Sequence, residues 1–182
     1  ISRHPPIGWE RQPTLIQEIE AAQERLAEVQ RAAPKARHIW PLGNHDARFE
    51  TRLATVAPEY AHVTGVHLRD HFPQWEPCWS VWINDDVVVK HRYKGGQHAT
   101  SNNPLWAGKT LITGHLHNLQ VRPFSDYNGT RWGVDTGTLA EPYGEQFDYL
   151  EDNPVNWRSG FVVLTFAKGQ LLGPELVRVT GA

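Results

Sequence analysis

Sulfur-containing residues are almost absent from this sequence. Its 182 residues include one cysteine, Cys78, and no methionine. A single thiol cannot form an internal disulfide, and closed structural zinc sites usually use several cysteines, so both kinds of cross-link are disfavoured. Because translation begins with methionine, a chain that begins at Ile1 and contains none is expected to start downstream of the native N-terminus.

The sequence also lacks an excess of charge of either sign and a long apolar run. Lysine and arginine total 18 and aspartate and glutamate total 20, so there is no general electrostatic footprint for nucleic acid or for an anionic membrane. Any phosphate binding must therefore be local. No segment resembles a signal peptide or a transmembrane helix. We expect a cytoplasmic protein with no membrane partner, and the length predicts one domain over residues 1–182.

Two amphipathic helices are predicted in the first third of the chain. The first follows a capping box formed by Thr14 and Gln17 and is stopped by Pro34. Its apolar residues recur at three- and four-residue spacing and should share one face: Leu15, Ile19, Ala22, Leu26, Val29 and Ala33. The second helix should begin at about Ala47 and end before Pro58. Its inward residues should be Phe49, Leu53 and Val56.

Strands are predicted for most of the remaining chain. Short apolar or alternating runs are typical of strands, and they occupy residues 36–42, 79–83, 87–89, 109–113, 119–121, 131–134, 161–166 and 175–179. Turns are expected at residues 84–86, at Asn128-Gly129 and at Lys168-Gly169. The combination of helices and strands predicts a layered α/β domain.

Polar clusters follow three of the predicted strands. These clusters are the loop Gly43-Asn44-His45-Asp46, His91 and Gly114-His115-Leu116-His117. Loops after such strands gather at one edge of a sheet, so we expect these side chains to converge. In an extended segment alternate side chains point to the same side, so His115 and His117 should face one small volume. The remaining histidines are expected to be structural or surface residues: His4, His38, His62, His67, His71 and His98.

Imidazoles with an amide oxygen are donors for a divalent transition metal. Mn, Fe, Zn and Ni accept such ligands, whereas Mg and Ca prefer oxygen alone. A pair of metal ions normally also needs a bridging carboxylate, which relieves the repulsion between the two cations. The sequence shows no obvious candidate for that carboxylate.

Together, the three clusters resemble the last three motif blocks of the calcineurin-like metallophosphoesterases. The resemblance covers residues 36–140. It implies a layered α-β-β-α sandwich of the metallophosphoesterase type that lacks its first strands, because the family's Asp-x-His and Gly-Asp-x-x-Asp blocks are absent. Residues 1–4 look like the segment that follows the second of these blocks, so the domain is expected to be incomplete at its N-terminus.

The resemblance also implies a role for each matched residue. Asn44, His91 and His115 match the ligands of one metal ion, and His117 matches a ligand of a second. His45 matches the residue that hydrogen-bonds the phosphoryl or leaving-group oxygen without binding metal. Asp46 would support His45.

Two basic residues follow His91, where many family members have glycine. Arg92 and Lys94 could hold a substrate phosphate by charge-assisted hydrogen bonds, or they could be solvated loop charges. The segment Thr136-Gly137-Thr138 resembles the small-residue loop that borders the family's site.

These roles predict a hydrolase. Two divalent transition metal ions would activate a water for attack on a phosphodiester, with nucleic acid as one possible substrate, or on a phosphomonoester. The alternative is a catalytically impaired phosphoesterase-like domain that acts as a binding module. A single structural zinc site is a third reading, which the lone cysteine disfavours. The substrate, the metals and the oligomeric state stay open.

Overall fold

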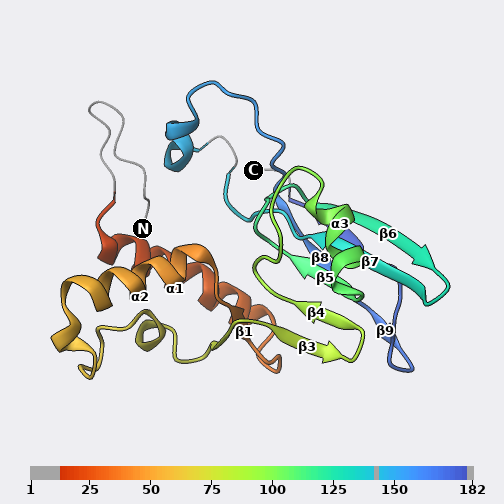
Figure 1. The fold of residues 1–182 in the computed structure, drawn as a ribbon. Coiled ribbons are helices and arrows are strands. Elements are labelled where there is room, and N and C mark those ends of the chain that lie inside the picture. Colours follow the sequence, from red (N-terminus) through yellow and green to blue (C-terminus); the bar gives the residue numbers. More distant parts are fainter. Residues whose placement is uncertain (1–12, 142–143, 180–182) are drawn as a thin grey trace. The chain divides into compact units, whose positions relative to one another are not determined.

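The computed structural model describes residues 13–141 and 144–179, which form two compact units (Figure 1). The first unit is Ile1–Cys78 and the second is Trp79–Ala182. Residues 1–4, including His4, lie outside the described ranges. No helix in those ranges is long and apolar enough to cross a membrane.

In the first unit, helix α1 spans Leu15–Ala32 and begins at the predicted capping box. The Oγ1 atom of Thr14 accepts a hydrogen bond from the Gln17 amide, and the Gln17 side chain accepts one from the Thr14 amide at 2.9 Å. On the predicted apolar face, Ile19 is buried, whereas Leu15 and Val29 remain 42% and 45% exposed.

Helix α2 spans Asn44–Val56 and therefore begins three residues before the predicted position. The cause is an N-cap on α2, in which the Asp46 carboxylate accepts the Gly43 amide at 2.6 Å. Residues that were predicted to form a loop are therefore the first turn of the helix. Phe49 is buried as predicted, but Val56, the last residue of the helix, is 69% exposed, so its inward position is wrong.

The rest of the first unit is a short strand pair and two turns of 3₁₀ helix. Strand β1 (Ile39–Pro41) pairs in parallel with β2 (Glu76–Cys78). Between them lie η1 (Pro58–Tyr60) and η2 (Leu68–His71).

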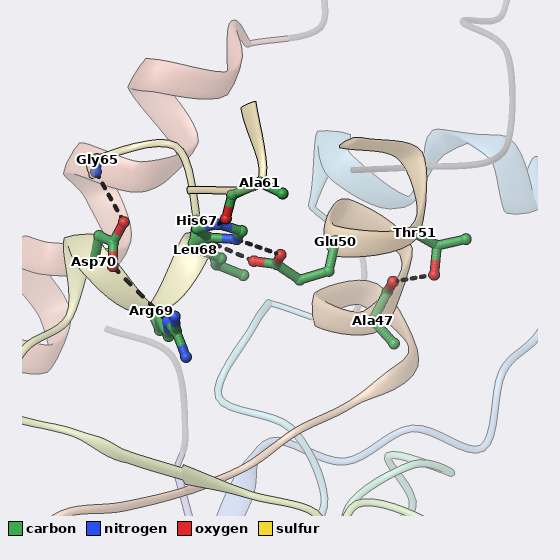
Figure 2. A network of polar contacts seen from close by, with 9 residues as sticks. All are labelled: Ala47, Glu50, Thr51, Ala61, Gly65, His67, Leu68, Arg69 and Asp70. Carbon is green, nitrogen blue, oxygen red and sulfur yellow. Dashed lines mark hydrogen bonds and ion pairs between the residues drawn. The ribbon is translucent and has the colours of Figure 1, made fainter. Parts of the chain in front are cut away.

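A network of hydrogen bonds holds the segment between α2 and β2 against α2 (Figure 2). The Glu50 carboxylate accepts the Leu68 amide at 2.9 Å and contacts Nδ1 of His67 at 2.9 Å, while the other ring nitrogen of His67 contacts the Ala61 carbonyl at 2.9 Å. Asp70 accepts the Gly65 amide at 2.8 Å. His67 is thus held as a structural residue, as predicted.

The second unit is built on a five-stranded mixed sheet in the order β3-β4-β5-β7-β6. Its strands are β3 (Val81–Asn84), β4 (Val87–Val89), β5 (Thr110–Thr113), β6 (Gln120–Asp126) and β7 (Gly129–Asp135). Strands β4, β5 and β7 run in parallel, and the edge strands β3 and β6 are antiparallel to their neighbours. The hairpins predicted at residues 84–86 and at Asn128-Gly129 are confirmed. The core consists of Val87, Ile112 and Val134.

Helix α3, which spans Ala99–Ala107, packs on this sheet against β5, β6 and β7 (Figure 1). No pattern in the sequence predicts this helix, because Pro104 lies inside it and its buried face includes the polar residues Thr100 and Asn103. Gly133 of β7 allows the close approach: a Cβ atom there would lie 1.7 Å from the Thr100 carbonyl oxygen.

The C-terminal strands form two nested antiparallel pairs. Strand β8 (Gly160–Val163) pairs with β11 (Glu175–Arg178), and β9 (Phe166–Ala167) pairs with β10 (Gln170–Leu171). The 3₁₀ helix η3 (Glu145–Leu150) precedes them. The predicted hairpin at Lys168-Gly169 is confirmed. The protein is a mixed α/β protein whose five-stranded sheet packs against α3.

Candidate metal centre

His91 and His115 lie side by side beyond the ends of β4 and β5. The parallel pairing of these strands continues past their ends, since the Lys90 amide donates to the Ile112 carbonyl and the Gly114 amide donates to the His91 carbonyl at 3.1 Å. The two imidazoles consequently approach each other. Nε2 of His91 is 3.0 Å from Nδ1 of His115, and the ring planes are inclined at 72°.

The surroundings favour the neutral form of His115. Burial lowers the pKa of this imidazole, and the charge of Arg92 and the charge that His117 would carry lower it further. A neutral imidazole has a lone pair available for a metal ion. Because the two facing nitrogens lie at hydrogen-bond distance, they can share either one proton or one cation.

His117 adopts a conformation that its spacing does not predict. Strand β5 ends at Thr113, and His117 lies in the following loop with a φ of 61°, in the left-handed region. The argument that His115 and His117 share one side of an extended segment is therefore wrong. The Arg158 amide donates to the His117 carbonyl at 2.7 Å, and the Trp157 ring lies 5.0 Å from the imidazole.

The Nδ1 atom of His117 is buried and has no hydrogen-bond partner within the part of the chain that the structure describes. Burial also lowers the pKa of this imidazole, although the nearby Asp135 opposes the shift. This nitrogen lies in the same loop as His115. An unpartnered ring nitrogen is a donor that fits a cation.

Asp135, which the sequence analysis did not single out, is the acidic residue of this region. It ends β7 and is 0% exposed. Its carboxylate accepts the amides of Leu116, Asn118 and Gly137 at 3.1, 3.1 and 3.2 Å. Burial raises the pKa of Asp135, and these three hydrogen bonds act against that shift. One signal was available: an aspartate directly after the apolar residues of a central strand.

The two basic residues after His91 differ in their contacts. The Nζ atom of Lys94 lies 4.0 Å from the centre of the Trp106 ring, a cation–π contact, and the Lys94 carbonyl accepts a hydrogen bond from Asn103. Arg92 is exposed, and its charge acts on His115. Phosphate binding by Arg92 and Lys94 stays a prediction.

The first cluster, Asn44 to Asp46, belongs to the other unit and forms the first turn of α2. Asp46 also accepts the indole N–H of Trp40 at 3.3 Å. His45 and Asp46 border a largely apolar cavity of about 440 Å³ whose other walls come from α1, β1 and η2. The convergence of Asn44 with His91 and His115, and the support of His45 by Asp46, stay predictions.

Over the described ranges, no three side chains of the types His, Cys, Asp and Glu form a group that could hold a metal ion. The two facing imidazoles of His91 and His115 are nevertheless donors of the kind that a divalent transition metal prefers.

Comparisons of the chain with known proteins found no similar protein. No protein-family model matches the chain, and neither a curated protein nor a solved structure matches it. The motifs and the geometry described above therefore carry the functional interpretation.

Proposed function

We propose that this chain holds a divalent transition metal at His91 and His115 and that the site serves the hydrolysis of phosphoesters. The observation that carries the proposal is the 3.0 Å separation of Nε2 of His91 and Nδ1 of His115. Two imidazole nitrogens that face each other at this distance can bind one metal ion, and burial lowers the pKa of His115, which favours its neutral form.

The resemblance to the calcineurin-like metallophosphoesterases supplies the remaining parts of the proposal. Asn44 is a further ligand of the metal at His91 and His115, and His117 binds a second metal. The fold is then the layered α-β-β-α sandwich of that family. The metals are drawn from Mn, Fe, Zn and Ni, because imidazole and amide ligands suit these ions.

The metals, His45 and Arg92 would each contribute to the hydrolysis in a different way. The bound metals supply Lewis acidity toward water and toward the phosphoryl oxygens. His45 donates a hydrogen bond to the phosphoryl or leaving-group oxygen, where negative charge develops. The exposed guanidinium of Arg92, whose charge reaches His115, neutralises part of the charge of the substrate. A phosphodiester, including nucleic acid, suits this basic segment better than a monoester does.

The test is metal-dependent turnover of generic substrates by the full chain. Bis(4-nitrophenyl) phosphate and 4-nitrophenyl phosphate would be offered with Mn²⁺, with and without a chelator. We expect turnover that requires Mn²⁺, is faster on the diester and disappears in His115→Ala. The exposed His62 provides the control variant His62→Ala, which should keep the wild-type rate. Turnover should be slow, since the sequence contains neither Asp-x-His nor Gly-Asp-x-x-Asp to complete the second metal site.

The outcomes separate the two functional classes. Mn²⁺ binding that is lost in His115→Ala, without any turnover, would favour a metal-dependent binding module over an enzyme. Absence of Mn²⁺ binding by the wild-type chain would contradict the proposed site.

A further inference from the structure

A single buried carboxylate organises the loop that carries His115 and His117. This loop connects β5 to β6, and its Leu116 and Asn118 amides both donate to Asp135, one to each carboxylate oxygen. These two amides flank His117 on either side. The third donor, the Gly137 amide, comes from the turn that follows Asp135 itself.

The loop needs such an anchor because its backbone is unfavourable. His117 and Leu119 have φ values of 61° and 38°, which side-chain-bearing residues rarely adopt. Conformations of this kind persist where the surrounding structure fixes them, and they gather at functional sites. Here the fixing contacts are the carboxylate on one side and, on the other, the 2.7 Å hydrogen bond from the Arg158 amide to the His117 carbonyl.

Asp135 is buried, and its carboxylate is compensated by hydrogen bonds from backbone amides. A carboxylate that is removed from water is destabilising unless hydrogen bonds to its charged form compensate. Asp135 is 0% exposed, and the three hydrogen bonds that its side chain accepts within the described residues all come from backbone amides. Two of the three come from the loop at residues 114–119, called the histidine loop below. The buried carboxylate therefore stabilises the conformation of that loop.

We infer that Asp135 is a positioning residue that sets the direction of the His115 and His117 imidazoles toward the divalent cations proposed for them. The inference rests on the proposed metal site and deepens it. Asp135 is not itself a ligand in this account, because both of its oxygens are occupied by backbone N–H groups. It fixes the backbone from which the two ligands project.

The experiment compares two aspartate-to-asparagine variants of the full chain. Asp135→Asn preserves the volume but turns an amide N–H₂ toward a backbone N–H, so at least one loop contact is lost. Asp126→Asn is the control: Asp126 also accepts a backbone amide, that of Asn128 at 2.8 Å, and pairs with the Arg131 guanidinium, but at the turn between β6 and β7. The probe is Co²⁺, whose visible absorption reports both affinity and ligand geometry.

We expect Asp135→Asn to weaken Co²⁺ binding by about tenfold or more and to change the absorption spectrum, as is usual when a partner that orients metal ligands is lost. The far-UV circular dichroism should stay that of the wild type. Asp126→Asn should change the affinity less than about twofold, since its carboxylate touches no residue of the histidine loop. Equal Co²⁺ affinity in wild type and Asp135→Asn would overturn the inference alone, whereas absence of binding by the wild type would overturn the proposed metal site.

Amide hydrogen exchange in the metal-free wild type keeps the inference testable even if Asp135→Asn does not fold. The Leu116 and Asn118 amides should exchange at least about tenfold more slowly than expected for an open loop, because each donates to a buried acceptor. Exchange of these two amides at the rate of an unprotected chain would show that the carboxylate does not hold the loop.

Discussion

The two units hold their candidate residues by different means. In the second unit, His91 and His115 follow strands whose side chains Val87 and Ile112 are 2% exposed, so a packed core supports the histidines. In the first unit, Ile16 of α1 remains 55% exposed. The second unit thus depends on apolar burial and close packing, which are worth more per residue than surface polar contacts.

Polar contacts at helix ends and loops are correspondingly more important in the first unit. The capping box of Thr14, the cap formed by Asp46 and the Glu50 network each fix a helix end or a loop. Such contacts are individually modest and depend on charge and solvent. The comparison predicts that substitutions in the second unit will have large effects on stability and that those in the first unit will have small or pH-dependent ones.

The largest effect is expected for Gly133→Ala. Its Cβ atom would meet the Thr100 carbonyl oxygen at 1.7 Å, so α3 and β7 would have to separate. We expect destabilisation of more than about 4 kcal/mol, in the range that is exceptional for one substitution. Chemical denaturation would measure it. Gly173→Ala is the control, because a Cβ atom there meets nothing within 4 Å, and a similar loss in both variants would refute the packing argument.

A matched pair of isoleucines compares a buried position in the second unit with an exposed position in the first. Ile112→Ala removes a side chain from the core of the sheet and should lower the free energy of unfolding by about 3 kcal/mol. Ile16→Ala makes the same chemical change on the exposed face of α1 and should have an effect within about 0.5 kcal/mol. Equal losses in urea denaturation would mean that α1 is covered in solution.

The start of α1 provides a test of intermediate size. Thr14→Ala removes the oxygen that accepts the Gln17 amide and should destabilise the protein by about 1 kcal/mol. Thr55→Ala is a suitable control, since its hydroxyl only donates back to the Thr51 carbonyl within α2. Thermal unfolding of both variants would show whether the cap contributes; an equal stability of Thr14→Ala and wild type would argue against it.

The smallest effect is the pH dependence of His67. Both ring nitrogens face acceptors, so the hydrogen bond to Glu50 and then that to Ala61 raise the pKa of His67. A raised pKa in the folded state stabilises the protein fully below the unfolded value of about 6.5, and this contribution is lost as the pH rises through the folded pKa. The wild type should therefore exceed His67→Gln in Tm more at about pH 5.5 than at about pH 8.5.

His62→Gln serves as the control for this experiment, because His62 is an exposed histidine of the same segment. If the His67→Gln difference changed with pH no more than the His62→Gln difference, the imidazole of His67 would not be held as a cation in the folded protein.

Local signals in the sequence predicted a good part of the fold. The capping box of Thr14 and the turn at Asn128-Gly129 involve residues close in sequence, so their chemistry determines the geometry. The meeting of His91 and His115 also follows from sequence, because each comes directly after a strand of one parallel pair.

Features that depend on tertiary contacts could not be predicted in this way. Helix α3 has no apolar periodicity and is stabilised by packing on a glycine of β7. The left-handed backbone of His117 lies between two amides that donate to Asp135, which is 18 residues distant in sequence. A spacing rule for extended chains therefore failed for His117, although both histidines are in the same loop.

The central claim, that His91 and His115 hold a metal ion, is tested most directly by histidine-ring NMR signals during a Mn²⁺ titration of the wild-type chain. A bound paramagnetic ion broadens the signals of nearby nuclei. The signals of His91 and His115 should broaden first, before those of His38 and His71. A chelator should restore them. Uniform broadening of all histidines, or selective broadening elsewhere with His91 and His115 unaffected, would contradict the claim.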